Sequence, residues 1–157
     1  MPNKIIPNLW FNGNADEAAK FYCSVFKTAK ITDTTHYVEG SHKPIGTVLT
    51  VELEIEGQPL VFINAGDEFK LSPAVSLSVT VEDQAELDEL YGKLSANPKA
   101  EVCGWLEDKF GLSWQIVPRR LQELVKDKDK AKAKRATEAM LKMKKLDIAK
   151  LEAAAAG

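Results

Sequence analysis

An internal repeat limits the folds open to this chain more than any other feature. Residues 14–22 (Asn-Ala-Asp-Glu-Ala-Ala-Lys-Phe-Tyr) resemble residues 83–91 (Asp-Gln-Ala-Glu-Leu-Asp-Glu-Leu-Tyr). Each segment follows a stretch typical of a β-strand and carries apolar residues at helical spacing. Tyr22 and Tyr91 lie 69 positions apart, about the length of one small module. The repeat therefore predicts one domain made of two similar modules, rather than two separate domains.

Both halves of the chain predict the order β-α-β-β-β. In the first half, Asn14 or Asp16 is expected to cap a helix that runs to about Phe26. In the second half, Glu82-Asp83 is expected to cap a helix that runs to about Leu94. Turn residues separate the other apolar segments. The predicted strands cover residues 4–11, 31–37, 47–55 and 60–63 in the first half, and 74–81, 100–103, 103–106 and 112–117 in the second.

The last two of these strands form a predicted hairpin. Residues 107–111 (Glu-Asp-Lys-Phe-Gly) have turn chemistry, and Pro118 ends the second strand. Side chains alternate across a strand, so Gln115 faces away from Trp114. Trp105 and Trp114 are expected in the core. A glutamine in the middle of a buried-looking strand raises the question of whether its face is core or the wall of a pocket.

Polar side chains on three predicted strands indicate the same location for such a pocket. If Ile5, Leu9 and Phe11 pack on the helices, the residues between them face the opposite side of the sheet. Alternation along residues 74–81 places the serines on the face opposite the valines. The chain therefore predicts either a solvated sheet face or a small-molecule pocket, which is apolar with a few convergent polar groups. The candidate ligand-binding residues are Asn8, Trp10, Ser76, Ser78 and Gln115.

The C-terminal residues change to helical character. A short helix is predicted over residues 119–125, and a longer one is predicted from Asp127-Lys-Asp129 to about Lys145. The longer helix has a narrow apolar seam amid many lysines, formed by Ala133, Ala136, Met140 and Met143. Two interpretations stay open: the segment packs on its own domain, or it clamps a partner subunit.

Composition limits the partners and the compartment. Formal net charge is −2, which gives no reason to expect nucleic acid or anionic lipid as a partner. No apolar run is long enough to span a bilayer. Two cysteines cannot form a disulfide framework, and the expected location is the cytoplasm. No catalytic residue is evident: His36 and His42 are expected at the surface, and no histidine stands near Cys103 to activate it.

Residues 104–111 (Gly-Trp-Leu-Glu-Asp-Lys-Phe-Gly) and 113–118 (Ser-Trp-Gln-Ile-Val-Pro) carry a resemblance to a known family. Together with the paired modules and Phe21-Tyr22, they resemble the vicinal-oxygen-chelate superfamily. The more specific resemblance is to its PhnB-like, or 3-demethylubiquinone-9 3-methyltransferase-like, branch. This implies an α+β fold, with two paired βαβββ modules forming a curled, glyoxalase-like mixed sheet with a cup. The predicted domain covers 1–120 (modules 1–66 and 74–118), and 121–157 is a C-terminal helical extension.

The resemblance also implies positions for metal ligands, and these positions hold unsuitable residues. They fall at Pro7 or Asn8, near Leu60, at Ser76 and at Gln115. Transition metals prefer imidazole, thiolate or carboxylate, so only Gln115 is a plausible ligand. The methyltransferase label has no support in the residues either, because no two of the nine glycines form a Gly-x-Gly pattern. We expect neither a metal nor another cofactor.

The function predicted from the sequence is metal-independent binding of an unknown small molecule in a sheet-lined cup of a homodimer. The alternative is a metal-dependent lyase, isomerase or dioxygenase of the same superfamily. A third hypothesis is a structural or interaction protein whose helical tail is its functional surface. Whether any reaction is catalysed is left open.

Overall fold

The computed structural model describes residues 3–157 of the chain. The chain divides into two compact units, which join between Leu71 and Ser72. Each unit has its own sheet; the first unit has one helix and the second has the remaining helices. No helix of the described residues is long and apolar enough to cross a membrane.

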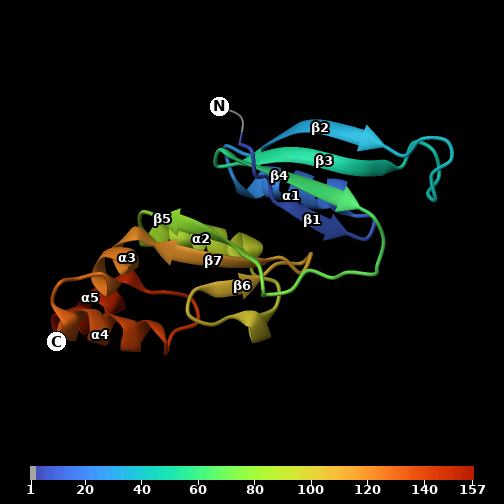
Figure 1. The fold of residues 1–157 in the computed structure, drawn as a ribbon. Coiled ribbons are helices and arrows are strands. Elements are labelled where there is room, and N and C mark those ends of the chain that lie inside the picture. Colours follow the sequence, from blue (N-terminus) through green and yellow to red (C-terminus); the bar gives the residue numbers. More distant parts are fainter. Residues whose placement is uncertain (1–2) are drawn as a thin grey trace. The chain divides into compact units, whose positions relative to one another are not determined.

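The first unit is a four-stranded mixed sheet with one helix. The strands run in the order β1-β4-β3-β2, with β1 parallel to β4 and the other pairs antiparallel. Helix α1 lies along one face of this sheet (Figure 1). The elements are β1 (Asn8–Phe11), α1 (Ala15–Val25), β2 (Lys30–His36), β3 (Val48–Ile55) and β4 (Gln58–Asn64).

Alternation along the strands separates the two faces of this sheet. Phe62 is fully buried on the α1 side, where Tyr22 of α1 contacts its ring edge-on at 5.7 Å. The predicted packing of Leu9 and Phe11 on this side is confirmed, since both are buried. The predicted start of the first strand is wrong: β1 begins at Asn8, and Ile5 is 86% exposed. The apolar side chains of this face are Leu9, Phe11, Val51, Leu53, Ile55, Leu60 and Phe62.

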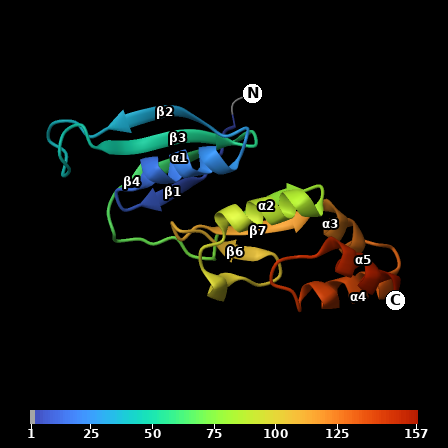
Figure 2. The ribbon, with the colours of Figure 1, turned by 180° about the vertical axis from the view of Figure 1, so that it is seen from behind.

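The second unit repeats this arrangement with fewer strands. Its sheet has the order β5-β7-β6, and its first strand, β5, is again parallel to the last, β7. Figure 2 shows α2 along one side of β7, where Trp114 and Ile116 are buried. The elements are β5 (Ser76–Val81), α2 (Gln84–Leu94), a 3₁₀ helix (Pro98–Ala100), β6 (Trp105–Glu107) and β7 (Ser113–Pro118).

The strand predicted at residues 100–103 is wrong. Val102 forms only an isolated bridge with Trp105. The chain reverses at Cys103 and Gly104, which have φ values of 51° and 86°. Their N–H groups donate to the carbonyl groups of Met143 and Lys144, each at 2.8 Å, instead of to a neighbouring strand. The last predicted hairpin strand, by contrast, is confirmed as β7.

The C-terminal helices α3 (Arg119–Val125), α4 (Lys130–Met140) and α5 (Ile148–Ala156) belong to the second unit. Figure 1 shows them grouped together in that unit. Their shared core includes Leu124, Ala136 and Leu151, each at most 1% exposed. The prediction of one helix continuing to Lys145 is wrong, because α4 ends at Met140. The tail thus packs on its own unit, whereas a contact with a partner subunit stays untested.

A buried hydroxyl in the second unit gives a testable pH dependence. Tyr91 is 7% exposed, and its hydroxyl has no hydrogen-bond partner in the described residues. Burial first, and then the charge of Glu101, raise its pKa from 10.0 to about 12. Below pH 10 the phenol is neutral in both the folded and unfolded states. As pH rises from 10 towards 12, the tyrosine ionises in the unfolded state but stays neutral in the folded state. The free energy of unfolding therefore falls over this pH range.

We therefore expect Tyr91→Phe to raise the free energy of unfolding by about 1 kcal/mol at pH 7, because an unpaired buried hydroxyl disappears. The advantage over the wild type should grow above pH 10. Urea unfolding of both proteins at pH 7, 10 and 11 measures it. A less stable variant at pH 7 would mean that the hydroxyl is hydrogen-bonded, for instance to a buried water.

Candidate functional site

The helix-free face of the second sheet carries a hydrogen-bonded polar pair. The Gln115 amide nitrogen on β7 donates to the Ser76 hydroxyl oxygen on β5 over 2.9 Å. The parallel register places Ser78 directly opposite Gln115, so both side chains share this face. Trp114 and Ile116, which alternate with Gln115, point to the α2 side. The structure thus brings together Ser76, Ser78 and Gln115 of the predicted site.

The polar pair leaves hydrogen-bonding capacity unused. Gln115 is half-buried, and its amide oxygen has no hydrogen bond within the described chain. The Ser78 hydroxyl is exposed and likewise makes none to residues 3–157. An amide oxygen accepts and a hydroxyl both donates and accepts, so the face offers both kinds of group. It can therefore bind a ligand that carries a hydroxyl, an amide or a carbonyl group.

An aromatic side chain lies beside the polar pair. Trp105 on β6 is paired with Gln115 in the antiparallel register, which places both on the same face. The prediction that Trp105 belongs to the core is wrong, because this side chain is only half-buried and lies on the face opposite Trp114. The register of the predicted hairpin could have revealed this position, because residues paired across antiparallel strands share a face of the sheet. Trp105 is the functional candidate that the sequence reasoning missed.

Helix α3 closes one end of this face. The Gln122 amide nitrogen donates to the Thr80 hydroxyl oxygen at 3.1 Å. Thr80 alternates with Val79 and Val81, so it lies on the same side of β5 as Ser76 and Ser78. This bond uses the Thr80 hydroxyl oxygen as an acceptor. The donors and acceptors that stay unused on this face therefore lie mainly at Gln115 and Ser78.

Asn8 and Trp10 lie on the helix-free face of the first sheet. They alternate on β1 with Leu9 and Phe11, which face α1. The Asn8 amide nitrogen donates locally, to the Ile6 carbonyl oxygen at 3.0 Å. Asn8 therefore keeps its amide oxygen for other contacts.

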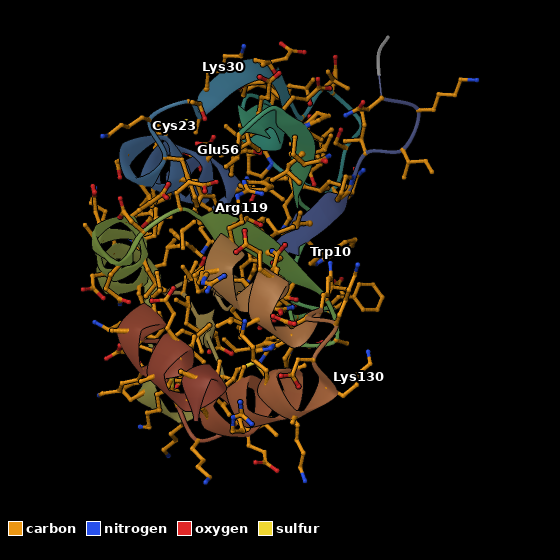
Figure 3. All side chains as sticks on the ribbon, turned by 90° about the vertical axis from the view of Figure 1, so that its left-hand side faces the viewer. Trp10, Cys23, Lys30, Glu56, Arg119 and Lys130 are labelled. Carbon is orange, nitrogen blue, oxygen red and sulfur yellow. The ribbon has the colours of Figure 1, made fainter. Side chains whose placement is uncertain are left out.

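Trp10, labelled in Figure 3, lies on this face because it alternates on β1 with the buried Leu9 and Phe11. Its indole nitrogen donates to the Gly66 carbonyl oxygen at 2.9 Å. The ring meets Phe69 edge-on, with 5.0 Å between ring centroids. Because its one donor is occupied, Trp10 can supply only apolar or stacking contact to a ligand.

The residues that are present do not fit the metal that the fold family implies. No group of three or more His, Cys, Asp or Glu side chains in residues 3–157 is arranged to hold a metal ion. Leu60, at one of the expected ligand positions, is 1% exposed and lies on the α1 side of its sheet. Gln115 donates its amide nitrogen to Ser76, and an amide oxygen alone is a weak ligand for zinc, nickel or iron.

The paired modules define the class of protein. In each unit a first strand, followed by a helix, lies parallel to the last strand of an otherwise antiparallel sheet, and this is the glyoxalase-like fold of the vicinal-oxygen-chelate superfamily. The family model described as 3-demethylubiquinone-9 3-methyltransferase matches residues 3–117, and the chain belongs to that family. No curated protein matches the chain.

Solved structures support this assignment. A putative 3-demethylubiquinone-9 3-methyltransferase, PhnB protein, from Bacillus cereus is 33% identical, with a TM-score of 0.63; the match covers 74% of this chain and 99% of that one. Protein PA1353 from Pseudomonas aeruginosa is 20% identical, covering 74% and 97%, with a TM-score of 0.57. The fosfomycin resistance protein FosX from Listeria monocytogenes is 11% identical, covering 78% and 98%, with a TM-score of 0.52. The latter two show the fold alone.

Proposed function

We propose that this protein binds a small molecule on the helix-free sheet face around Gln115, without a metal ion. The observation that supports the proposal most is the bond between the Gln115 amide and the Ser76 hydroxyl. This bond fixes the orientation of the glutamine and leaves its oxygen available. A half-buried polar group that is held in place costs little further entropy when it binds a ligand.

The neighbours of Gln115 indicate the chemistry of the ligand. Trp105 offers an aromatic surface, and Ser78 offers a hydroxyl group. No cationic side chain lies in β5, β6 or β7. We therefore propose a compact ligand that is partly apolar or aromatic and carries a hydroxyl or an amide. Asn8 and Trp10 remain proposed ligand contacts on the first unit's own sheet.

The proposal predicts a specific loss of binding. Metal-free, full-length protein is screened by protein-observed NMR against small hydroxylated, amide-bearing and heteroaromatic compounds. A hit should shift the Gln115 side-chain amide and the Trp105 indole signals. Gln115→Ala should weaken its binding about tenfold, the effect of one lost hydrogen bond at a partly buried group. Gln58→Ala, an exposed amide that bonds to its own neighbour Pro59, is the matched control.

Two outcomes would contradict this function. One is a screen whose hits leave the Gln115 and Trp105 signals unmoved. The other is about one equivalent of zinc, nickel, iron or manganese in freshly purified protein, lost in Gln115→Ala, which would make the metal-dependent enzyme the better interpretation. The homodimer also remains a proposal, and light scattering of the same sample tests it against the 17.3 kDa of one chain.

A further inference from the structure

A cavity lies in the second unit, on residues that the proposed site does not use. Its volume is about 530 Å³, which is within the range of small-molecule sites. Helix α2 forms one wall, and the connection from α4 to the first turn of α5 forms the other. This connection lies beyond residue 117, where the family match ends. The lining residues of the two walls are mostly charged.

The cavity carries an excess of positive charge. Four lysines and two aspartates line it. Lys145 pairs with Asp88 at 2.7 Å, and Lys150 pairs with Asp147 at 3.4 Å. Lys142 and Lys144 have no ion pair within residues 3–157, although both line the cavity. Two positive charges in the same cavity therefore have no counter-charge. Their mutual repulsion raises the electrostatic free energy of the cavity, and a bound anion would lower it.

The two aspartates stay ionised at neutral pH, so they continue to neutralise only their own lysines. Hydrogen bonds from Lys145 and then from Gln84 hold the pKa of Asp88 below its usual value. The backbone N–H of Lys150 is the main cause of the lowered pKa of Asp147. The surplus of positive charge in the cavity therefore lies at Lys142 and Lys144.

The backbone that carries the two unpaired lysines is held in place. The carbonyl oxygens of Met143 and Lys144 accept from the N–H groups of Cys103 and Gly104, each at 2.8 Å. A Cβ atom at Gly104 would lie 2.9 Å from Leu146, which shows how closely this connection packs on the β6 turn. These backbone contacts hold the segment that carries Lys142 and Lys144 in place without a ligand.

Gln84 of α2 joins the two walls. Its amide nitrogen donates to the Leu146 carbonyl oxygen at 3.2 Å, and its amide oxygen accepts from the Ile148 N–H at 2.9 Å. The same nitrogen donates to Asp88 at 2.9 Å. One side chain thus fixes the start of α5 against α2, and the cavity is a built part of the fold rather than a gap between mobile segments.

We propose that this cavity binds a small phosphorylated molecule, whose phosphate group lies between Lys142 and Lys144. A phosphate monoester carries close to two negative charges at neutral pH, which matches the two unpaired lysines. Lysine is a common phosphate ligand that acts as a point charge. Met143 and Ala149, which also line the cavity, supply apolar surface for the rest of the molecule.

The wider charge distribution supports an anionic ligand. Residues 119–157 hold 12 of the 21 lysines and arginines but only 6 of the 23 aspartates and glutamates. This segment therefore has a formal charge of +6, although the whole chain has −2. A basic region of this kind raises the local concentration of small anions, and the cavity gives one place where they can be held.

The test uses inorganic pyrophosphate as the probe and isothermal titration calorimetry of the full chain at low ionic strength. The wild type should bind one equivalent of pyrophosphate. A titration with sodium chloride at the same ionic strength should show no binding. Lys142→Gln with Lys144→Gln should weaken binding at least roughly tenfold, because two charge-assisted contacts are lost. Lys142→Arg with Lys144→Arg keeps the charge and should retain most of the binding.

A matched control removes the same charge from another part of the basic segment. Lys128 and Lys130 are exposed, and Lys130 extends away from α4 in Figure 3. Lys128→Gln with Lys130→Gln should leave binding unchanged. Equal weakening in both double variants would overturn the site in favour of general attraction to a basic surface, and no binding by the wild type would also overturn it. Gln115→Ala should still bind pyrophosphate, so this test is independent of the proposed function.

Discussion

Asp108→Ala should lower the free energy of unfolding of this protein by about 4 kcal/mol, near the upper end for one substitution. Asp108 is 2% exposed and closes the turn between β6 and β7. One carboxylate oxygen accepts from the N–H groups of Phe110 and Leu112, at 2.9 and 3.1 Å. The other accepts from the Trp114 indole at 2.8 Å. Alanine would remove this acceptor from all three donors, of which the Leu112 N–H and the Trp114 indole are buried, at about 1–3 kcal/mol for each buried donor.

Chemical unfolding measures this effect, and hydrogen exchange of the β7 amides shows whether the loss lies in the second unit. Asp108→Asn should cost less than alanine, because its oxygen can still serve the two backbone donors while its amide faces the indole donor. In a Trp114→Phe background, Asp108→Ala should cost less than in the wild type, since one donor is already absent. Full additivity of the two substitutions would contradict the indole contact.

The sequence predicted this hairpin well because its signals are local. Acidic residues and a glycine between two apolar runs indicate a turn, and residue parity places Gln115 opposite Trp114. The bond from the Trp114 indole to Asp108 has no such signal, because it depends on how the strand folds back. The prediction that Trp105 belongs to the core fails, because its register with Gln115 puts it on the helix-free face.

The errors in the predicted elements have a tertiary origin. Residues 100–103 have apolar content that favours a strand, but Cys103 and Gly104 bond to the connection between α4 and α5. That connection lies about 40 positions further along the chain, so no local pattern reveals it. The predicted helix to Lys145 fails for the same reason: the carbonyl groups of Met143 and Lys144 accept from residues outside any helix.

The start of α1 shows how a distant residue can replace an expected local contact. Asn14 was one of two predicted caps, and it occupies the N-cap position without a side-chain cap hydrogen bond. The Asn64 side chain, at the end of β4, accepts from the Ala15 N–H at 2.9 Å instead. Asp83, the equivalent residue of the second unit, caps α2 as predicted by accepting from the Glu86 N–H. From the sequence alone, nothing about an asparagine at the end of a strand indicates that its side chain caps a distant helix.

Asn64→Ala should therefore destabilise the first unit by about 3 kcal/mol. Asn64 is 6% exposed, and its amide nitrogen also donates to the Val48 carbonyl oxygen at 3.1 Å. Alanine would leave the N–H of Ala15, which is fully buried, without an acceptor. Chemical unfolding measures the loss, and hydrogen exchange should show faster opening of α1 amides.

The contrast with Asn14→Ala makes this prediction discriminating. A residue whose side chain makes the capping hydrogen bond costs about 0.5–2 kcal/mol when replaced by alanine, whereas one that makes none should cost less than about 0.5 kcal/mol. If Asn14→Ala proves the more damaging of the two, the sequence interpretation of this helix start would be right after all. If Asn64→Ala does, residues 49 positions apart fix the start of α1.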